Sequence, residues 1–197
     1  MALTKTTSVS TVDAWQLVSP ATLVTGADAN VSASYESLLY IQLAMGEATA
    51  QTGCSVFVEV SYTGNDWVKL TGFLGTTETP AATTINDAAV DAGDTSLTLT
   101  DATTGDFDEK GRLWFILDET VGNSEAVRTK SNSMHTVTLC DALLRAHANG
   151  LTCIDRCDEW VVSIPFPVSY CRVVVNNTDA DADVYFTSRL SVVTAIA

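Results

Sequence analysis

One stretch decides the fold: Cys54-Ser55-Val56-Phe57-Val58-Glu59-Val60-Ser61-Tyr62. In a strand, successive side chains point to opposite faces, so the even-numbered residues of 54–62 are predicted to form one buried apolar face. The odd-numbered residues are polar, with Phe57 as the exception. Turn-forming residues follow at Thr63–Asp66, and Trp67–Leu70 then reads as a second strand. The stretch therefore predicts a β-hairpin with a four-residue loop.

The rest of the chain shows similar short runs, separated by Gly, Asn, Asp and Thr. Such runs, spaced roughly every 8–12 residues, are typical of an all-β sandwich or barrel. Residues 72–84 are poor in core-forming side chains and are predicted to be a connector. One helix is expected over Asp141–Gly150, although a segment this short could also form a helical turn or a loop. The strand-sized runs are 14–18, 37–45, 95–100, 112–117, 125–130, 135–139, 160–164, 170–175 and 184–193.

The chain is strongly acidic. Its 197 residues include 10 Lys and Arg against 24 Asp and Glu, which gives a formal net charge of −14. A hydrophobic content of 46% excludes a disordered chain, and the acidic surplus would repel phosphate, so no nucleic-acid partner is expected. No run approaches the ~18 apolar residues of a membrane span, and the first residues lack the apolar core of a secretory signal. We therefore expect a cytosolic protein with no membrane partner.

The cysteines indicate no metal site. Cys153 and Cys157 have the spacing of half a zinc site, but neither His135 nor His147 lies in a pair that would complete it. A disulfide between the two cysteines is opposed by a reducing cytosol, so buried free thiols are favoured. The five cysteines are Cys54, Cys140, Cys153, Cys157 and Cys171.

Acidic residues gather on the predicted loops, where their oxygens would suit Ca²⁺. Their order does not match a calcium-binding EF-hand loop, so solvated surface charge is the favoured interpretation. The chain also lacks the G-x-S-x-G, P-loop and dinucleotide-binding motifs. We therefore expect no catalytic residue, no cofactor and no enzymatic activity. The acidic loop residues are Asp87, Asp91, Asp94, Asp101, Asp106, Asp108, Glu109, Asp179, Asp181 and Asp183.

Four tryptophans could either fill the core or line a sugar-binding surface. Trp114 and Trp160 lie inside apolar runs and are predicted to be core residues. For Trp67, which follows a turn, an exposed ligand-binding ring and a core position are both open. The fourth tryptophan is Trp15.

Two passages resemble virion proteins of tailed bacteriophages. Residues 53–70, a valine-rich strand followed by Ser-Tyr-Thr-Gly-Asn-Asp-Trp, are similar to a hairpin of phage jelly-roll modules. Residues 170–178, Tyr-Cys-Arg-Val-Val-Val-Asn-Asn-Thr, are similar to the closing strands of the same sandwiches. Between them, residues 93–102, 111–117 and 125–128 resemble small β-barrel modules of phage structural proteins. The resemblance implies a split jelly-roll-like β-sandwich of residues 1–80 plus 155–197, with an inserted β-barrel-like module over residues 81–154.

The same resemblance implies a non-enzymatic capsid decoration (cement) protein. Such a protein assembles in the host cytoplasm, commonly as a homotrimer, and binds the major capsid protein on the virion surface. The polar N-terminal arm could contact a partner by strand addition, and an unpaired chain end is the alternative. The candidate contact residues are Leu3, Thr4, Lys5, Thr6 and Thr7.

Two other functions fit the same sequence. One is a tail, fibre or baseplate adaptor of the virion, built from the same modules. The other is a carbohydrate-binding β-sandwich with Trp67 at its site.

Overall fold

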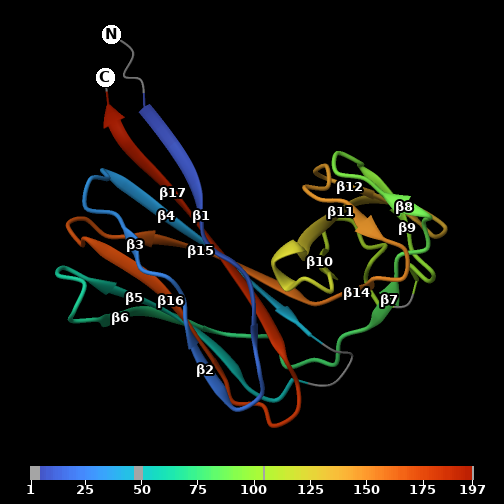
Figure 1. The fold of residues 1–197 in the computed structure, drawn as a ribbon, viewed down its shortest axis with the longest axis horizontal. Helices are drawn as coiled ribbons and strands as arrows, with labels where there is room; N and C mark the ends of the chain where they lie inside the picture. Colours follow the sequence, from blue (N-terminus) through green and yellow to red (C-terminus); the bar gives the residue numbers. More distant parts are fainter. Residues whose placement is uncertain (1–4, 47–50, 104, 197) are drawn as a thin grey trace.

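The regular secondary structure of the described residues is almost entirely antiparallel β-strand, arranged in two adjacent lobes (Figure 1). The computed structural model describes residues 5–46, 51–103 and 105–196. Every strand pairing among these residues is antiparallel, which confirms the all-β fold class. The elements are β1 (Lys5–Val18), β2 (Thr22–Thr25), β3 (Ala29–Asn30), β4 (Glu36–Met45), β5 (Cys54–Ser61), β6 (Val68–Leu74), β7 (Ala82–Thr84), β8 (Ala89–Val90), β9 (Ser96–Thr98), β10 (Leu113–Leu117), the 3₁₀ turn η1 (Val121–Asn123), β11 (Glu125–Ser133), β12 (Thr136–Leu139), β13 (His147–Ala148), β14 (Thr152–Ile154), β15 (Cys157–Ile164), β16 (Tyr170–Asn177) and β17 (Val184–Ile196).

The larger lobe is a jelly roll. One of its sheets has the strand order β1-β17-β4-β15, and the other has β2-β16-β5-β6, with the short β3 also paired to β16. Taken in chain order, these eight main strands give the orders 1-8-3-6 and 2-7-4-5, which are those of two Greek keys wound into a jelly roll. The first and last strands pair along their length, so the start of β1 and the end of β17 lie side by side at one end of this lobe (Figure 1).

The predicted hairpin is present and supplies the centre of the jelly-roll core, but its loop spans residues 62–67 instead of the expected 63–66, so Trp67 lies in the loop and not in the second strand. β5 and β6 pair, and Cys54, Val56, Val58 and Val60 are all buried between the two sheets. Tyr62, which was expected on the same face, is 66% exposed. That expectation was wrong because the strand ends at Ser61, where the Ser61 hydroxyl accepts hydrogen bonds from the backbone of the following turn.

The smaller lobe is a six-stranded sheet of order β7-β14-β10-β11-β12-β9 that curves onto itself. An isolated bridge joins Ile85 and Leu99, the residues that directly follow its first and last strands, β7 and β9. Backbone hydrogen bonds from Asn86 to Thr98 and from Thr100 to Thr84, both 2.8 Å, strengthen this closure. A separate apolar core, which includes Trp114 and Phe107, fills the interior. The lobe is therefore a small barrel, while the domain boundaries at residues 80 and 155 stay a prediction.

The expected helix over Asp141–Gly150 is not formed. This segment consists of turns and the two-residue strand β13, which pairs with β8. The backbone of Leu143 accepts a hydrogen bond from Gly93 and donates one to Asp94, both at 2.8 Å. The Glu125 carboxylate accepts the next two N–H groups. The helix prediction was wrong because these distant partners bond backbone groups that an α-helix would bond internally.

A third apolar cluster joins the lobes. Trp15 from β1 packs on Phe115 from β10, with ring centroids 4.5 Å apart. Phe115 also packs on Tyr185 from β17 at 5.6 Å, and Ala44 completes the cluster. The apolar cores of the two lobes are therefore linked by this cluster.

Leu39 is expected to be essential for the jelly-roll core. Its side chain is 1% exposed, so Leu39→Ala leaves a cavity and should lower the free energy of unfolding by about 2–5 kcal/mol. The matched Leu144→Ala removes a side chain that is 64% exposed and should change stability by less than about 0.5 kcal/mol. Urea unfolding followed by tryptophan fluorescence measures both values. Equal effects of the two variants would contradict the assigned core.

Candidate functional site

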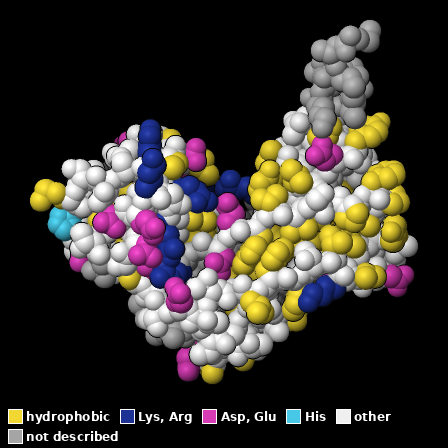
Figure 2. Space-filling model, turned by 180° about the vertical axis from the view of Figure 1, so that it is seen from behind, with side chains coloured by type: hydrophobic (Ala, Val, Ile, Leu, Met, Phe, Trp, Pro, Cys, Tyr) yellow, Lys and Arg dark blue, Asp and Glu magenta, His cyan; other side chains and the backbone are white. Residues whose placement is uncertain are grey.

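A polar hollow lies between the lobes (Figure 2). It consists of three adjoining cavities of about 470, 380 and 230 Å³, and Glu159 of β15 lines all three. The Glu159 carboxylate pairs with Arg128 of β11 at 3.2 Å and accepts a hydrogen bond from Gln42 of β4 at 2.8 Å. The charges at the centre of the hollow are therefore satisfied within the protein.

The smallest cavity is more apolar. Val9 and Tyr40 line it together with Arg189, and all three side chains lie on the outer face of the sheet that contains β1. Arg189 is exposed and has no carboxylate partner among the described residues. On the face shown in Figure 2, hydrophobic side chains lie mainly over the jelly-roll lobe, and charged ones lie mainly over the barrel and the hollow.

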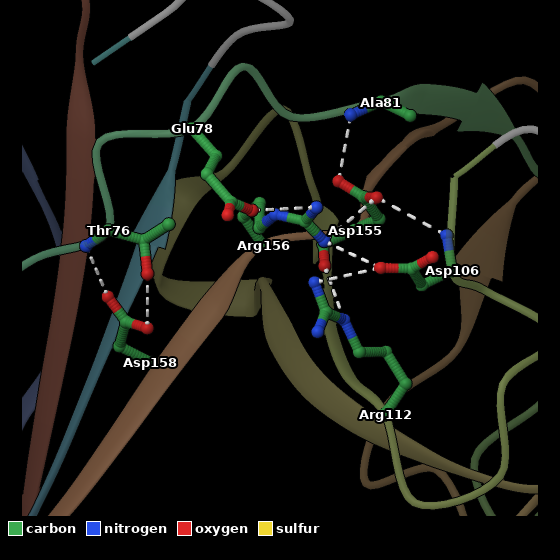
Figure 3. Close-up of polar contacts among 8 residues, drawn as sticks. All are labelled: Thr76, Glu78, Ala81, Asp106, Arg112, Asp155, Arg156 and Asp158. Atoms are coloured by element: carbon green, nitrogen blue, oxygen red, sulfur yellow. Dashed lines mark hydrogen bonds and ion pairs between the residues drawn. The ribbon is translucent and has the colours of Figure 1, made fainter.

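Both chain connections between the lobes pass through one charged joint (Figure 3). Asp155 is its centre, with an exposed fraction of 1%. The Asp155 carboxylate accepts hydrogen bonds from the N–H groups of Ala81 at 2.8 Å and Asp106 at 3.3 Å. Burial raises the pKa of Asp155, while these two hydrogen bonds and the nearby Arg112 guanidinium oppose the rise.

Arg156 connects the joint to Glu78, in the segment that runs from the jelly roll into the barrel. Its guanidinium contacts Asp155 at 3.2 Å, Asp106 at 3.0 Å and Glu78 at 3.1 Å (Figure 3). Arg112 pairs with the same Asp106 carboxylate at 3.2 Å. The network ties residues on both connections to the barrel, so its role is to hold the lobes in one orientation.

A second link reinforces the joint. The N–H and hydroxyl of Thr76 each donate a 2.8 Å hydrogen bond to the Asp158 carboxylate (Figure 3). Thr76 is the second residue after the end of β6, and Asp158 is the second residue of β15. The chain is thus fastened where it leaves the jelly roll and where it returns.

His147 is fully buried in the barrel. Its Nε2 lies 2.6 Å from a Glu125 oxygen, and its Nδ1 lies 3.7 Å from an Asp118 oxygen. Because the ring is inaccessible and Glu125 also accepts backbone hydrogen bonds, this group fixes the loop before β13 rather than offering a reactive site.

Trp67 is half-buried beneath a cation. The Arg172 guanidinium lies 3.9 Å from the indole centroid, and Glu59 pairs with Arg172 at 2.8 Å. A sugar could stack on this ring face only by displacing Arg172. The indole is therefore already engaged in a cation–π contact worth about 0.5–1 kcal/mol.

The other tryptophans pack inside the protein. Trp114 has no exposed surface and donates its indole N–H to Thr129, which confirms the core prediction. Trp160 is half-buried and stacks on Phe73 with ring centroids 5.1 Å apart. Trp15, for which both interpretations were open, is 6% exposed in the cluster between the lobes.

The predicted partner-contact residues lie at the start of β1. Leu3 and Thr4 lie outside the described residues, whereas Lys5, Thr6 and Thr7 pair with the end of β17. Thr6 and Thr7 are exposed, and β1 is an edge strand of its sheet. Their contact with a partner stays a prediction.

The cysteines are all free thiols. Cys54, Cys153 and Cys171 are buried, Cys157 is half-buried and Cys140 is exposed. Burial raises the pKa of Cys54 and of Cys171 to about 12, with smaller contributions from nearby carboxylates. These buried thiols are therefore unreactive packing groups.

Several acidic loop residues accept hydrogen bonds from nearby loop residues or pair with neighbouring cations. Asp101 accepts hydrogen bonds from the N–H and hydroxyl of Thr103, Asp94 accepts one from the N–H of Asp91, and Asp106 is part of the joint. Within residues 5–46, 51–103 and 105–196, no three His, Cys, Asp or Glu side chains are grouped so as to hold a metal ion. The same residues contain no helix long and apolar enough to cross a bilayer.

Asp179 is the clearest example of an acidic loop residue whose carboxylate accepts hydrogen bonds from nearby residues. Its carboxylate accepts hydrogen bonds from the hydroxyl and N–H of Thr52, both 2.6 Å, and from the N–H groups of Asp181 and Ala182, both 2.8 Å. These four bonds, led by the Thr52 hydroxyl, lower the pKa of Asp179 well below its ordinary value.

The charged joint was missed in the sequence. Arg156 stands far from both Glu78 and Asp106 along the chain, and no motif links it or Arg112 to these acidic residues. Their only sequence signal is position, since Asp155 and Arg156 follow β14 at the predicted boundary between barrel and jelly roll.

The chain matches no family model and no curated protein. Among solved structures, it shows 8% identity and a TM-score of 0.21 to VP17, a capsid protein of bacteriophage P23-77, over 99% of this chain and 100% of that one. An infectious bursal disease virus structure (Gx strain) shows 7% identity and a TM-score of 0.21, over 98% of this chain and 42% of that one. Likenesses of this size establish neither a shared fold nor a shared function.

Arg156 is expected to stabilise the joint strongly. Arg156→Ala removes the only guanidinium in direct contact with the buried Asp155 carboxylate among the described residues, leaving the nearby Arg112, and should destabilise the protein by about 3 kcal/mol. The exposed Arg128–Glu159 pair provides the control, since Arg128→Ala should change the free energy of unfolding by only about 0–1 kcal/mol. Thermal and urea unfolding measure both variants, and a neutral Arg156→Ala would contradict the proposed role of the joint.

Asp179 is expected to make the free energy of unfolding depend on pH. Because its pKa is lowered in the folded state, the carboxylate stabilises the fold above its unfolded pKa, near 3.8, and this contribution is lost as the pH falls below that value. Urea midpoints should therefore differ most between the natural chain and Asp179→Asn at neutral pH. The difference should shrink as the pH falls towards 2, and a constant difference would contradict the assignment.

Proposed function

We propose that this chain is a non-enzymatic structural protein of a tailed-phage virion, and that it acts as a capsid decoration (cement) protein on the major capsid lattice. The jelly roll supports the proposal by analogy only, since this architecture is common in viral capsid and lectin domains and hosts several functions. The passages that resemble phage virion proteins form the β5–β6 hairpin and its neighbour β16, all in one sheet.

The edge strand β6 carries the proposal. Its Leu74, Val68 and Leu70 side chains are 82%, 64% and 37% exposed, and Tyr62 beside it is 66% exposed. A strand edge lined with exposed apolar side chains is an association site that proteins normally cover. We assign the major capsid protein as the partner that covers it, because β6 begins within residues 53–70, one of the two passages that resemble phage virion proteins.

The hollow between the lobes supports a structural role rather than catalysis. Glu159, Arg128, Arg156 and Asp155 are engaged with one another or with nearby groups, which leaves a rigid polar surface. A decoration protein needs such rigidity, since it stabilises a shell by bridging subunits that would otherwise separate. The homotrimer implied by the resemblance stays a prediction.

The test uses phage particles that lack the chain. Purified protein is added back to particles from a phage in which its gene is deleted. We expect saturable binding to the head, seen by cryo-electron microscopy, and a higher temperature of DNA release. The Leu74→Asp, Val68→Asp double variant should reduce binding at least about tenfold, because two charges then face an apolar contact.

Leu144→Asp is the matched control, since it places a charge at an exposed leucine of the barrel and should bind normally. Circular dichroism checks that all variants keep their β-structure. Density at the tail instead of the head would overturn the decoration role in favour of an adaptor. Absence of the chain from natural virions would overturn the virion role itself.

A further inference from the structure

The outer edge of β1 is open. β1 is the end strand of its sheet, and among the described residues no strand pairs with its outer side over Thr7–Thr11. Farther along, the strand is partly covered, because it contacts η1 and β2. The open segment thus has free backbone donors and acceptors, which are a template for a further strand.

This segment is also the most regular part of the strand. Register shifts occur between Thr6 and Thr7 and again between Thr11 and Asp13, whereas Thr7–Thr11 pairs residue by residue with Arg189–Val193. Bulges normally disturb a strand edge and prevent further pairing. A straight five-residue window between two such irregularities is therefore a defined docking site.

The sequence of the window is a palindrome: Thr7-Ser8-Val9-Ser10-Thr11. In an antiparallel pair of identical strands centred on Val9, Val9 faces Val9, each Ser8 faces Ser10, and each Thr7 faces Thr11. Threonine pairs and pairs of β-branched residues are favourable across strands. The segment is thus complementary to itself, as an interface with two-fold symmetry requires.

The distribution of charge also favours a second copy of this chain as the partner. Two copies of a chain with a net charge of −14 repel each other, but Thr6–Val12 contains no charged residue and no proline. Two other edges of the jelly roll do carry charges, with Asp158 and Glu159 on β15 and Lys69 on β6, whereas the fourth edge, β2, is uncharged but only four residues long. Self-pairing through β1 therefore brings no like charges into direct opposition.

We propose that two copies of this chain pair through Thr7–Thr11, antiparallel and with a two-fold axis at Val9. The two four-stranded sheets then become one sheet of eight strands. Val9, which is 66% exposed in the single chain, becomes covered by its symmetry mate beside Tyr40. The pairing favours a dimer over the trimer implied by the resemblance. It uses the sheet opposite β6, so it does not depend on binding to a capsid.

The test is a charge swap at the axis. Sedimentation velocity at micromolar concentration should give twice the mass of the chain for the natural protein. Val9→Lys and Val9→Glu should each sediment at half that mass, because like charges meet at the two-fold axis. An equimolar mixture of the two variants should restore the doubled mass, which a folding defect could not do. Val161→Lys, at the opposite edge of the same sheet and 52% exposed, should remain a dimer.

Cross-linking tests the register. In a Cys140→Ser background, Val9→Cys should form a disulfide-linked dimer, because facing Cβ atoms lie about 4.5–5.5 Å apart. Thr7→Cys alone should not, whereas a mixture of Thr7→Cys and Thr11→Cys should. A monomeric or trimeric natural protein, or no restoration on mixing the charge variants, would overturn the proposal.

Discussion

The apolar layer between the two four-stranded sheets is the constraint on which the other features depend. Strands β5 and β16 contribute alternating valines and cysteines to it, and neither sheet can leave this face in water. The jelly-roll strand order that covers this apolar layer places β1 at the edge of one sheet and β6 at the edge of the other. The surfaces available for assembly are therefore consequences of core packing.

The orientation of the barrel rests on two kinds of contact at one place. An apolar cluster around Phe115 joins the cores, and the Asp155 network fastens the two chain connections beside it. Burying a carboxylate is unfavourable unless its hydrogen bonds and cations are supplied, and here neighbouring backbone groups and Arg156 supply them. The same packing leaves paired charges at the centre of the hollow, around Glu159, which suits a rigid connector.

The distribution of charge distinguishes acidic surfaces, which repel other copies of the chain, from uncharged or apolar surfaces, which can form contacts. Many acidic residues lie in loops, where several of them bond local backbone, whereas the open stretch of β1 is neutral and β6 exposes apolar side chains. Copies of a strongly negative chain repel each other, so they approach most easily where charge is absent. The proposed dimer edge follows from this rule, and the proposed shell-binding edge rests on its exposed apolar side chains.

The sequence by itself determined the all-β class, the β5–β6 hairpin and the core position of Trp114, because alternation along a strand is a local property. It did not determine the structure of residues 141–150, where the Glu125 carboxylate replaces helical hydrogen bonding, nor the cover of Trp67 by Arg172. The Thr7–Thr11 palindrome can be read in the sequence, but only the tertiary structure places it on an open edge. Strand order and side-chain partners depend on contacts between distant segments, and no local pattern records which segments will meet.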